Sequence, residues 1–242
     1  MRPVLIIQNQ ITDGPAYLVT WLQDRSIPYE TVCAQAGTAL PANINDYSAL
    51  AIMGGGMSAN DDLMSNRQAE ILILQAVLRN RPMIGHCLGG QLMTRALGGT
   101  VGPSRAPEIG WQPIDYSTDI MAEHWFGRAP TPRVMHWHYE AFSIPEGARR
   151  LASSEACTNQ AWSLGPHLAM QFHIEIDRDK ALAWSQDPDP LWTPALQEQT
   201  TVDSAADILA GIDRYLEQHQ RMADHVYGVW LSPTVWADHA RK

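Results

Sequence analysis

Residues 82–91, PMIGHCLGGQ, decide the fold, because they place a cysteine between a short apolar run and two adjacent glycines. The run 82–86 has the composition of a short buried strand, and 88–97 shows the pattern of a helix. Cys87 would therefore lie at a sharp strand-to-helix turn, where the glycines let the helix pack closely. A helix N-terminus also favours the thiolate form of a cysteine. The stretch fits a nucleophilic cysteine, and also a buried structural one.

The rest of the N-terminal half alternates between apolar runs and segments of helical spacing. Such alternation indicates a parallel sheet with helices on both faces, and ligands then bind beyond the carboxyl ends of the strands. We therefore expect an α/β fold with an open, mostly parallel sheet, in which the glycines 54–56 and Cys87 share one edge. The strands are expected at 4–8, 29–34, 47–53 and 82–86, and the helices at 17–25, 63–80 and 88–97.

The C-terminal half has a different pattern, in which strands separated by turn residues precede two helical segments. The second of these, 203–225, is amphipathic. Since there is no long linker, we expect one domain over 1–242, with a core of about 1–180 and a helical extension of about 181–242. The strands are expected at 111–117, 133–139, 149–154, 160–165 and 167–176, and a helix at 177–186.

The composition argues against several classes of protein. The 242 residues carry a formal charge of −9, and no basic cluster is longer than Arg149-Arg150, so nucleic acid is not an expected partner. No segment approaches the ~18 apolar residues of a membrane span, and the N-terminus lacks the features of a signal peptide. Three separated cysteines without a CxxC pair argue against a disulfide framework. We expect a cytoplasmic protein with no membrane partner.

Two further motifs favour the nucleophilic interpretation of Cys87. His173 and Glu175 end the expected strand 167–176 and, being two residues apart, would point to one side of it. A cysteine nucleophile needs a base such as histidine, and the base needs a carboxylate to orient it. The glycines 54–56 follow a strand and would let backbone N–H groups approach a developing oxyanion.

Five segments together resemble the class I, or triad-type, glutamine amidotransferases, in the group of stand-alone proteins similar to the glutaminase domain of GMP synthetase. Their order and spacing carry the resemblance over about residues 1–180, and it implies the flavodoxin-like fold of that family. The segments are MGGGMSANDD (53–62), PMIGHCLGGQLMTRALGG (82–99), EIGW (108–111), HWHYEAF (136–142) and FHIE (172–175).

The resemblance implies a mechanism. Cys87 would attack the amide carbon of glutamine, with His173 as general acid and base and Glu175 as the partner that orients it. Ammonia would leave, and water would hydrolyse the γ-glutamyl thioester, so neither a metal nor an organic cofactor is needed. The oxyanion would be held by backbone N–H groups of Leu88 and of Gly55 or Gly56.

The family motifs also imply substrate contacts. Gln91 matches the glutamine of the family's CLGxQ motif, and Trp137 and His138 fall in the loop that contacts the amino and carboxyl ends of the substrate. His136 and His138 could share one face of a strand, but no third ligand has suitable spacing, so no metal site is predicted.

Three positions depart from the family pattern. Ile174 stands where the family usually has proline between the catalytic histidine and glutamate; because proline fixes φ, the triad geometry is in question there. His86 replaces an apolar residue before the nucleophile and would pack or hydrogen-bond below the site. Glu140 stands where relatives often carry aspartate.

Three roles stay open on the sequence. The chain shows no GxxxxGK[ST] phosphate loop and no room for a synthetase domain, so a glutaminase would pass ammonia to an acceptor protein in trans. A stand-alone γ-glutamyl hydrolase or peptidase would use the same triad, and the third role is a non-catalytic binding or regulatory protein. The tryptophans of the C-terminal region are expected to cap the core, with a partner surface or homodimer contact as the alternative. They are Trp184, Trp192, Trp230 and Trp236.

Overall fold

The computed structural model describes residues 2–127, 132–186 and 189–232. Each helix in these ranges is too short or too polar to cross a membrane. Trp236 lies outside the described residues. The strands are β1 (Val4–Gln8), β2 (Tyr29–Cys33), β3 (Ala49–Ile52), β4 (Met83–His86), β5 (Val101–Pro113), β6 (Asp115–Tyr116), β7 (Arg133–Phe142), β8 (Arg149–Ser153), β9 (Ala161–Leu164) and β10 (His167–Met170).

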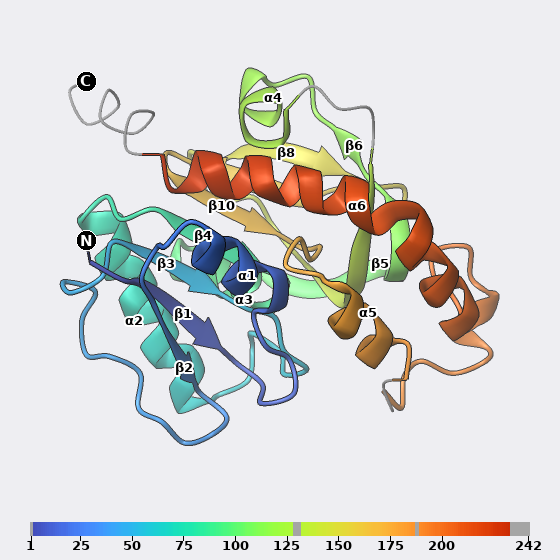
Figure 1. Cartoon of the computed structure of the whole chain (residues 1–242), viewed down its shortest axis with the longest axis horizontal. Helices are drawn as coiled ribbons and strands as arrows, with labels where there is room; N and C mark the ends of the chain where they lie inside the picture. Colours follow the sequence, from blue (N-terminus) through green and yellow to red (C-terminus); the bar gives the residue numbers. More distant parts are fainter. Residues whose placement is uncertain (1, 128–131, 187–188, 233–242) are drawn as a thin grey trace.

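The described residues form one large sheet of eight strands, in the order β2-β1-β3-β4-β10-β9-β8-β6. Neighbouring strands from β2 to β10 are parallel, and those from β10 to β6 are antiparallel. The expected open, mostly parallel sheet is therefore confirmed. It is visible as the central layer in Figure 1.

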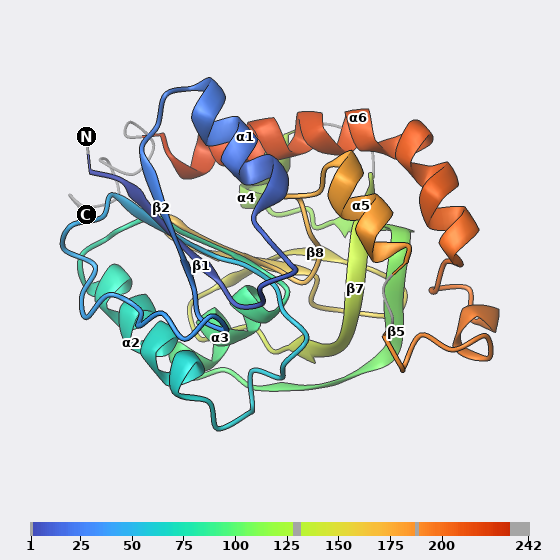
Figure 2. The same cartoon turned by 60° about the horizontal axis from the view of Figure 1, so that its bottom comes forward.

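Helices cover both faces of this sheet. They are α1 (Ala16–Asp24), α2 (Met64–Leu78), α3 (Leu88–Ala96), α4 (Ile120–Phe126), α5 (Arg178–Trp184) and α6 (Ala205–Trp230), with a short 3-10 helix, η1 (Leu196–Glu198). Figure 2 shows α1 and α6 on one side of the sheet and α2 and α3 on the other.

The apolar run of β1 is explained by burial on both of its faces. Val4 and Ile6 pack with α1, α4 and α6 in one hydrophobic cluster. Leu5 and Ile7 point the other way and pack with α2 and α3 in a second cluster. A strand covered on both faces loses the alternation of polar and apolar residues, and a continuous run results.

The strands β5 and β7 form a separate two-stranded antiparallel ribbon, seen beside the main sheet in Figure 2. Its register pairs Glu108 with His138 and Gly110 with His136. A third hydrophobic cluster packs this ribbon against α5 and the first half of α6, through residues that include Trp111 and Ile208. The second half of α6 packs on the main sheet. This helix therefore ties the ribbon to the sheet.

The structure differs from the sequence expectations in three places. The expected strand 111–117 is divided between two strands: its start is the end of β5, a ribbon strand that already begins at Val101, and its second part is β6, which belongs to the main sheet. The helix α4 was not expected, because seven residues are too few to show a helical period. The expected strand 167–176 ends at Met170, opposite His86 of the parallel neighbour β4. Beyond that point the chain leaves the main sheet and forms an isolated bridge to β7.

Two glycines of α6 give a matched test of its packing. A Cβ atom on Gly211 would lie 2.1 Å from Cδ1 of Trp111, whereas nothing lies within 4 Å of one on Gly228. Gly228→Ala should raise the free energy of unfolding by about 0.5–1 kcal/mol, because alanine favours the helix. Gly211→Ala should lower it by about 1–3 kcal/mol through overpacking. Urea unfolding measures both, and a Gly211→Ala variant as stable as Gly228→Ala would contradict this packing.

Candidate active site

The turn between β4 and α3 holds Cys87 in an uncommon backbone conformation, with φ 47° and ψ −110°. A residue with a Cβ atom rarely adopts positive φ, and such strain is typical of functional turns. The Cys87 N–H donates to the Met170 carbonyl oxygen at 2.8 Å, which anchors the turn to β10. A Cβ on Gly89 would lie 2.1 Å from the Ile52 carbonyl oxygen, so only glycine lets α3 pack this closely on β3.

His173 and Glu175 lie next to this turn although neither belongs to a named strand. His173 Nδ1 is 2.7 Å from Glu175 Oε1, and both side chains are buried. Nε2 is the ring nitrogen left for Cys87, whose side chain is among the groups that raise the pKa of His173. A Cβ on Gly54 would lie 2.7 Å from Cε1 of His173, so the first glycine of the run makes room for the ring.

Backbone contacts hold this segment from both sides. The His173 N–H donates to the Met135 carbonyl oxygen at 2.9 Å, and the Glu175 carbonyl oxygen accepts from the Tyr17 N–H at 2.9 Å. Ile174, which replaces the family's proline, is fully buried in the first hydrophobic cluster. Packing of this side chain and the flanking hydrogen bonds thus fix the segment where proline would restrict φ.

The charge on His173 is set by its neighbours. Burial alone would lower the pKa of His173, but the Glu175 carboxylate and the hydrogen bonds to Cys87 and Glu175 outweigh burial and raise it to about 10. The imidazole is therefore protonated at neutral pH. A positive charge beside a cysteine sulfur is the environment in which cysteines react as thiolates.

Lys180, at the start of α5, was not singled out from the sequence but contacts the same carboxylate. Its Nζ lies 3.0 Å from Glu175 Oε1, 2.8 Å from Asp13 Oδ1 and 2.9 Å from the Gly14 carbonyl oxygen. These three acceptors match the three donors of an ammonium group. Burial would raise the pKa of Glu175, but Lys180, followed by His173, holds it well below its usual value.

His86 lies on the far side of Glu175, with Nε2 3.7 Å from Oε2. Complete burial lowers the pKa of His86 to about 4, so this ring is neutral at physiological pH. Its position agrees with the expectation that it packs below the site. The Glu175 carboxylate is thus enclosed by a charged imidazole, an ammonium group and a neutral ring.

An aromatic wall formed by Trp137, Trp184 and Trp192 covers His173. The Trp184 ring meets His173 edge-on at a centroid distance of 4.7 Å, and Trp137 contacts Trp184 and Trp192 at 5.7 and 5.1 Å. Asp189 fixes the wall by accepting from Trp137 Nε1 at 3.0 Å. Two of the C-terminal tryptophans therefore lie at the site, whereas Trp230 is buried in the core as expected.

The backbone N–H groups expected at the oxyanion differ in availability. Gly56 N–H already donates to Gln10 Oε1 at 2.9 Å. Gly55 N–H makes no hydrogen bond to any residue that the structure describes. Leu88 N–H belongs to the first turn of α3, where a helix offers no internal acceptor. Gly55 and Leu88 are therefore the pair left free for an oxyanion.

Of the three residues expected to contact the substrate, Trp137 lies beside Cys87, whereas Gln91 and His138 are buried behind the main chain of β7. The Trp137 carbonyl oxygen lies 3.7 Å from Cys87 Sγ. Gln91 and His138 are 3% and 2% exposed, and both side chains reach the Glu140 carbonyl oxygen, at 3.5 and 3.1 Å. His138 lies on strand β7 rather than in a loop. Both buried side chains support the main chain of β7 in this structure.

Among the described residues, one group of three side chains has the composition and spacing to hold a metal ion: Glu108, His136 and His138. Glu108 is the third possible ligand, and the spacing of residues in the sequence did not reveal it. It lies 28 residues before His136 in the numbering and is brought close only by the register of β5 with β7.

Comparisons with known proteins relate this chain to the glutamine amidotransferases. Residues 22–181 match the family model "glutamine amidotransferase class-I". The glutamine amidotransferase-like protein YfeJ of Salmonella typhimurium is 32% identical over 183 residues, which cover 73% of this chain and 76% of that protein. A glutamine-hydrolyzing GMP synthase subunit of Ignicoccus hospitalis is 32% identical over 142 residues, 56% of this chain and 71% of that protein.

Two further similarities bear on function and fold. Gamma-glutamyl peptidase 3 of Arabidopsis thaliana is 30% identical over 106 residues, 41% of this chain and 43% of that protein. The crystal structure of a glutamine amidotransferase from Methylobacillus flagellatus superposes with a TM-score of 0.89 at 38% sequence identity. That superposition covers 96% of this chain and 94% of the other.

Lys180→Met should lower the free energy of unfolding at pH 7 by about 3–5 kcal/mol, because it leaves the buried Glu175 carboxylate without its ammonium partner. Arg178→Met is the matched control on the same helix, since Arg178 pairs with Asp213 at the exposed surface. Its effect should stay within about 0.5 kcal/mol. Urea unfolding measures both variants, and equal losses would contradict the role assigned to Lys180.

The loss in Lys180→Met should also depend on pH. Because the pKa of Glu175 is held below its usual value, its interactions stabilise the wild type above the unfolded pKa of about 4.3 and are lost as the pH falls through the folded value. Without Lys180 the buried carboxyl takes up a proton more readily. The difference in unfolding free energy between wild type and variant should therefore shrink on acidification; a difference independent of pH would count against this account.

Proposed function

This chain belongs to the class I glutamine amidotransferase family, and from that premise we propose that it hydrolyses the amide of a γ-glutamyl substrate through Cys87, His173 and Glu175. The buried His173–Glu175 pair beside Cys87, which lies at a strained strand-to-helix turn, is the observation that supports this most. The parts of a nucleophile, its acid-base partner and an orienting carboxylate are all present.

The proposed reaction has two stages. Cys87 Sγ attacks the amide carbon, and the oxyanion is stabilised by the N–H groups of Leu88 and Gly55. Protonated His173 gives its proton to the leaving nitrogen, so ammonia departs and a γ-glutamyl thioester remains. His173 then takes a proton from water as the water attacks the thioester, and glutamate is released with the free cysteine.

Glu175 acts through His173 in this proposal. Its carboxylate fixes Nδ1 at 2.7 Å and so points Nε2 at the sulfur. It also stabilises the positive charge that His173 carries before ammonia leaves. Lys180 in turn keeps Glu175 ionised in a buried position. Neither stage of the proposed reaction needs a metal ion or an organic cofactor.

We propose free glutamine as the substrate, with ammonia passed to an acceptor or synthetase in trans. The similarity to a protein named as a glutamine-hydrolyzing GMP synthase component supports this assignment. The similarity to a gamma-glutamyl peptidase favours a second candidate, hydrolysis of γ-glutamyl peptides. The thioester is common to both, because the chemistry of its formation does not specify the leaving amine.

The glutamine analogue 6-diazo-5-oxo-norleucine should form one covalent adduct on wild-type protein, and none on Cys87→Ala. Cys157 provides an internal control, since burial raises its pKa to about 12 and keeps it protonated. Intact-mass and peptide mass spectrometry would locate the adduct. An adduct that persists in Cys87→Ala would refute Cys87 as the nucleophile.

Comparison of two substrate types would decide the leaving group. Wild-type protein should release ammonia from glutamine faster than it releases the amine of a γ-glutamyl dipeptide at equal concentration. His173→Gln should lower both rates by about 10²–10⁴-fold, because the proton for the leaving group is lost. Faster turnover of the dipeptide would instead assign the peptidase function, and unchanged rates in His173→Gln would overturn the proposed triad.

A further inference from the structure

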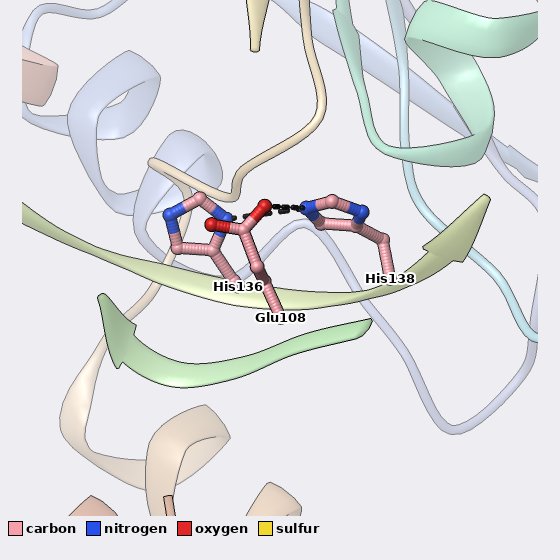
Figure 3. Close-up of side chains that lie close together, drawn as sticks. All are labelled: Glu108, His136 and His138. Atoms are coloured by element: carbon pink, nitrogen blue, oxygen red, sulfur yellow. Dashed lines mark hydrogen bonds and ion pairs between the residues drawn. The ribbon is translucent and has the colours of Figure 1, made fainter. Parts of the chain in front are cut away.

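A cluster of three buried side chains on the β5–β7 ribbon has no role in the reaction proposed above. Glu108 comes from β5, and His136 and His138 come from β7. Figure 3 shows the Glu108 carboxylate between the two imidazole rings. All three residues are 2% exposed or less, so bulk solvent does not reach them.

The hydrogen-bond pattern fixes the tautomer of His138. Its Nδ1 lies 3.1 Å from the Glu140 carbonyl oxygen. A carbonyl oxygen only accepts, so Nδ1 carries the hydrogen, and Nε2 of the neutral ring presents a lone pair. A histidine that donates one ring N–H to a backbone carbonyl and leaves the other nitrogen free has the arrangement typical of metal ligands.

The free nitrogen of His138 faces two further polar atoms. Nε2 lies 3.3 Å from Glu108 Oε2 and 3.4 Å from His136 Nδ1. A carboxylate oxygen opposite an imidazole lone pair is unfavourable in a buried position unless a positive charge lies between them. A proton on His138, the ring N–H of His136 or a metal cation can lie between these atoms.

The separations of these atoms match those of ligands around a single ion. Bonds of zinc to nitrogen or oxygen of about 2.0–2.2 Å, in tetrahedral directions, place neighbouring ligand atoms roughly 3.3 Å apart. The two contacts of His138 have this length, and all three ligand atoms lie within 4.8 Å of one another. Two imidazoles and a carboxylate are a ligand set suited to first-row divalent metals.

A fourth polar group adjoins the cluster. Gln160 is fully buried, and its Nε2 donates to Glu108 Oε2 at 2.6 Å. Its amide oxygen has no hydrogen-bond partner among the residues that the structure describes. Rotation of this amide would turn an unsatisfied oxygen toward the ligand atoms. The Gln160 amide oxygen is therefore a further atom that could coordinate a metal ion and that no protein group hydrogen-bonds in this structure.

We propose that Glu108, His136 and His138 bind a divalent first-row metal ion, with Zn²⁺ as the ion to test first. The ion would join β5 to β7 and so stabilise the ribbon whose Trp137 carbonyl oxygen faces Cys87. Its role is structural, because the proposed hydrolysis uses no step at this cluster. Binding would add to the stability of the folded chain, since the ligands meet only in the native register of the ribbon.

The test uses full-length protein purified without chelators and with an affinity tag that contains no histidine. After incubation with Zn²⁺ and gel filtration, elemental analysis should find about one metal ion per chain. Glu108→Gln and His136→Ala should lower zinc affinity by at least about tenfold. Zinc should raise the midpoint of thermal unfolding in the wild type and leave it unchanged in these variants.

Two controls separate this site from other zinc-binding groups. Cys87→Ser removes the thiol that, with His173, could itself bind zinc, and His225→Ala removes an exposed histidine of α6. Both should retain the bound ion. Loss of the ion in Cys87→Ser would overturn the proposal, as would a wild type that binds no stoichiometric metal.

A measurement on wild-type protein keeps the proposal testable even if the variants fail to fold. X-ray absorption at the zinc edge distinguishes sulfur from nitrogen and oxygen ligands by bond length. A shell of nitrogen and oxygen with imidazole scattering would support the assignment. A sulfur ligand would place the metal at a cysteine and contradict it.

Discussion

The buried carboxylate of Glu175 is the constraint on which the rest of the site depends. A fully buried carboxylate costs several kcal/mol unless charged partners and hydrogen bonds compensate it. Here His173 and Lys180 contact the same oxygen, at 2.7 and 3.0 Å. Because Glu175 must be compensated, His173 is held charged and in one orientation beside Cys87. The interaction that compensates the Glu175 charge is thus the same one that places a positive charge beside Cys87.

The partners of Glu175 come from distant parts of the fold. Asp13 follows β1, His173 follows β10, and Lys180 belongs to α5. They meet because parallel strands end at a common edge of the sheet, and the adjoining loops converge there. The helix α6 holds this arrangement together, since its two halves pack on the ribbon and on the main sheet. The helices α5 and α6 therefore help to build the site.

Much of the fold could be predicted from the sequence, because burial imposes its own pattern. The run 4–8 is apolar throughout since both faces of β1 are covered, and the expected strand coincides with the observed one. The helices after 63 and 88 lie within two residues of their predicted bounds for a similar reason. The family assignment from the quoted motifs is confirmed by the match over 22–181.

The features that escaped prediction depend on tertiary contacts. Lys180 lies 167 positions after Asp13, and no local sequence pattern predicts that these two residues form an ion pair. Glu108 reaches His138 only through the register of a bulged ribbon. The strand expected to 176 ends at Met170 because its partner β4 turns into the elbow there.

The central claim is that the Glu175 carboxylate keeps His173 positively charged beside Cys87 at neutral pH. Nitrogen-15 NMR of the histidine side chains, with His173→Gln for assignment, tests it directly. The account predicts that both ring nitrogens of His173 stay protonated through neutral pH and that the ring loses a proton only near pH 10, in line with a pKa of about 10. Deprotonation near the ordinary histidine value of about 6.5 would contradict it.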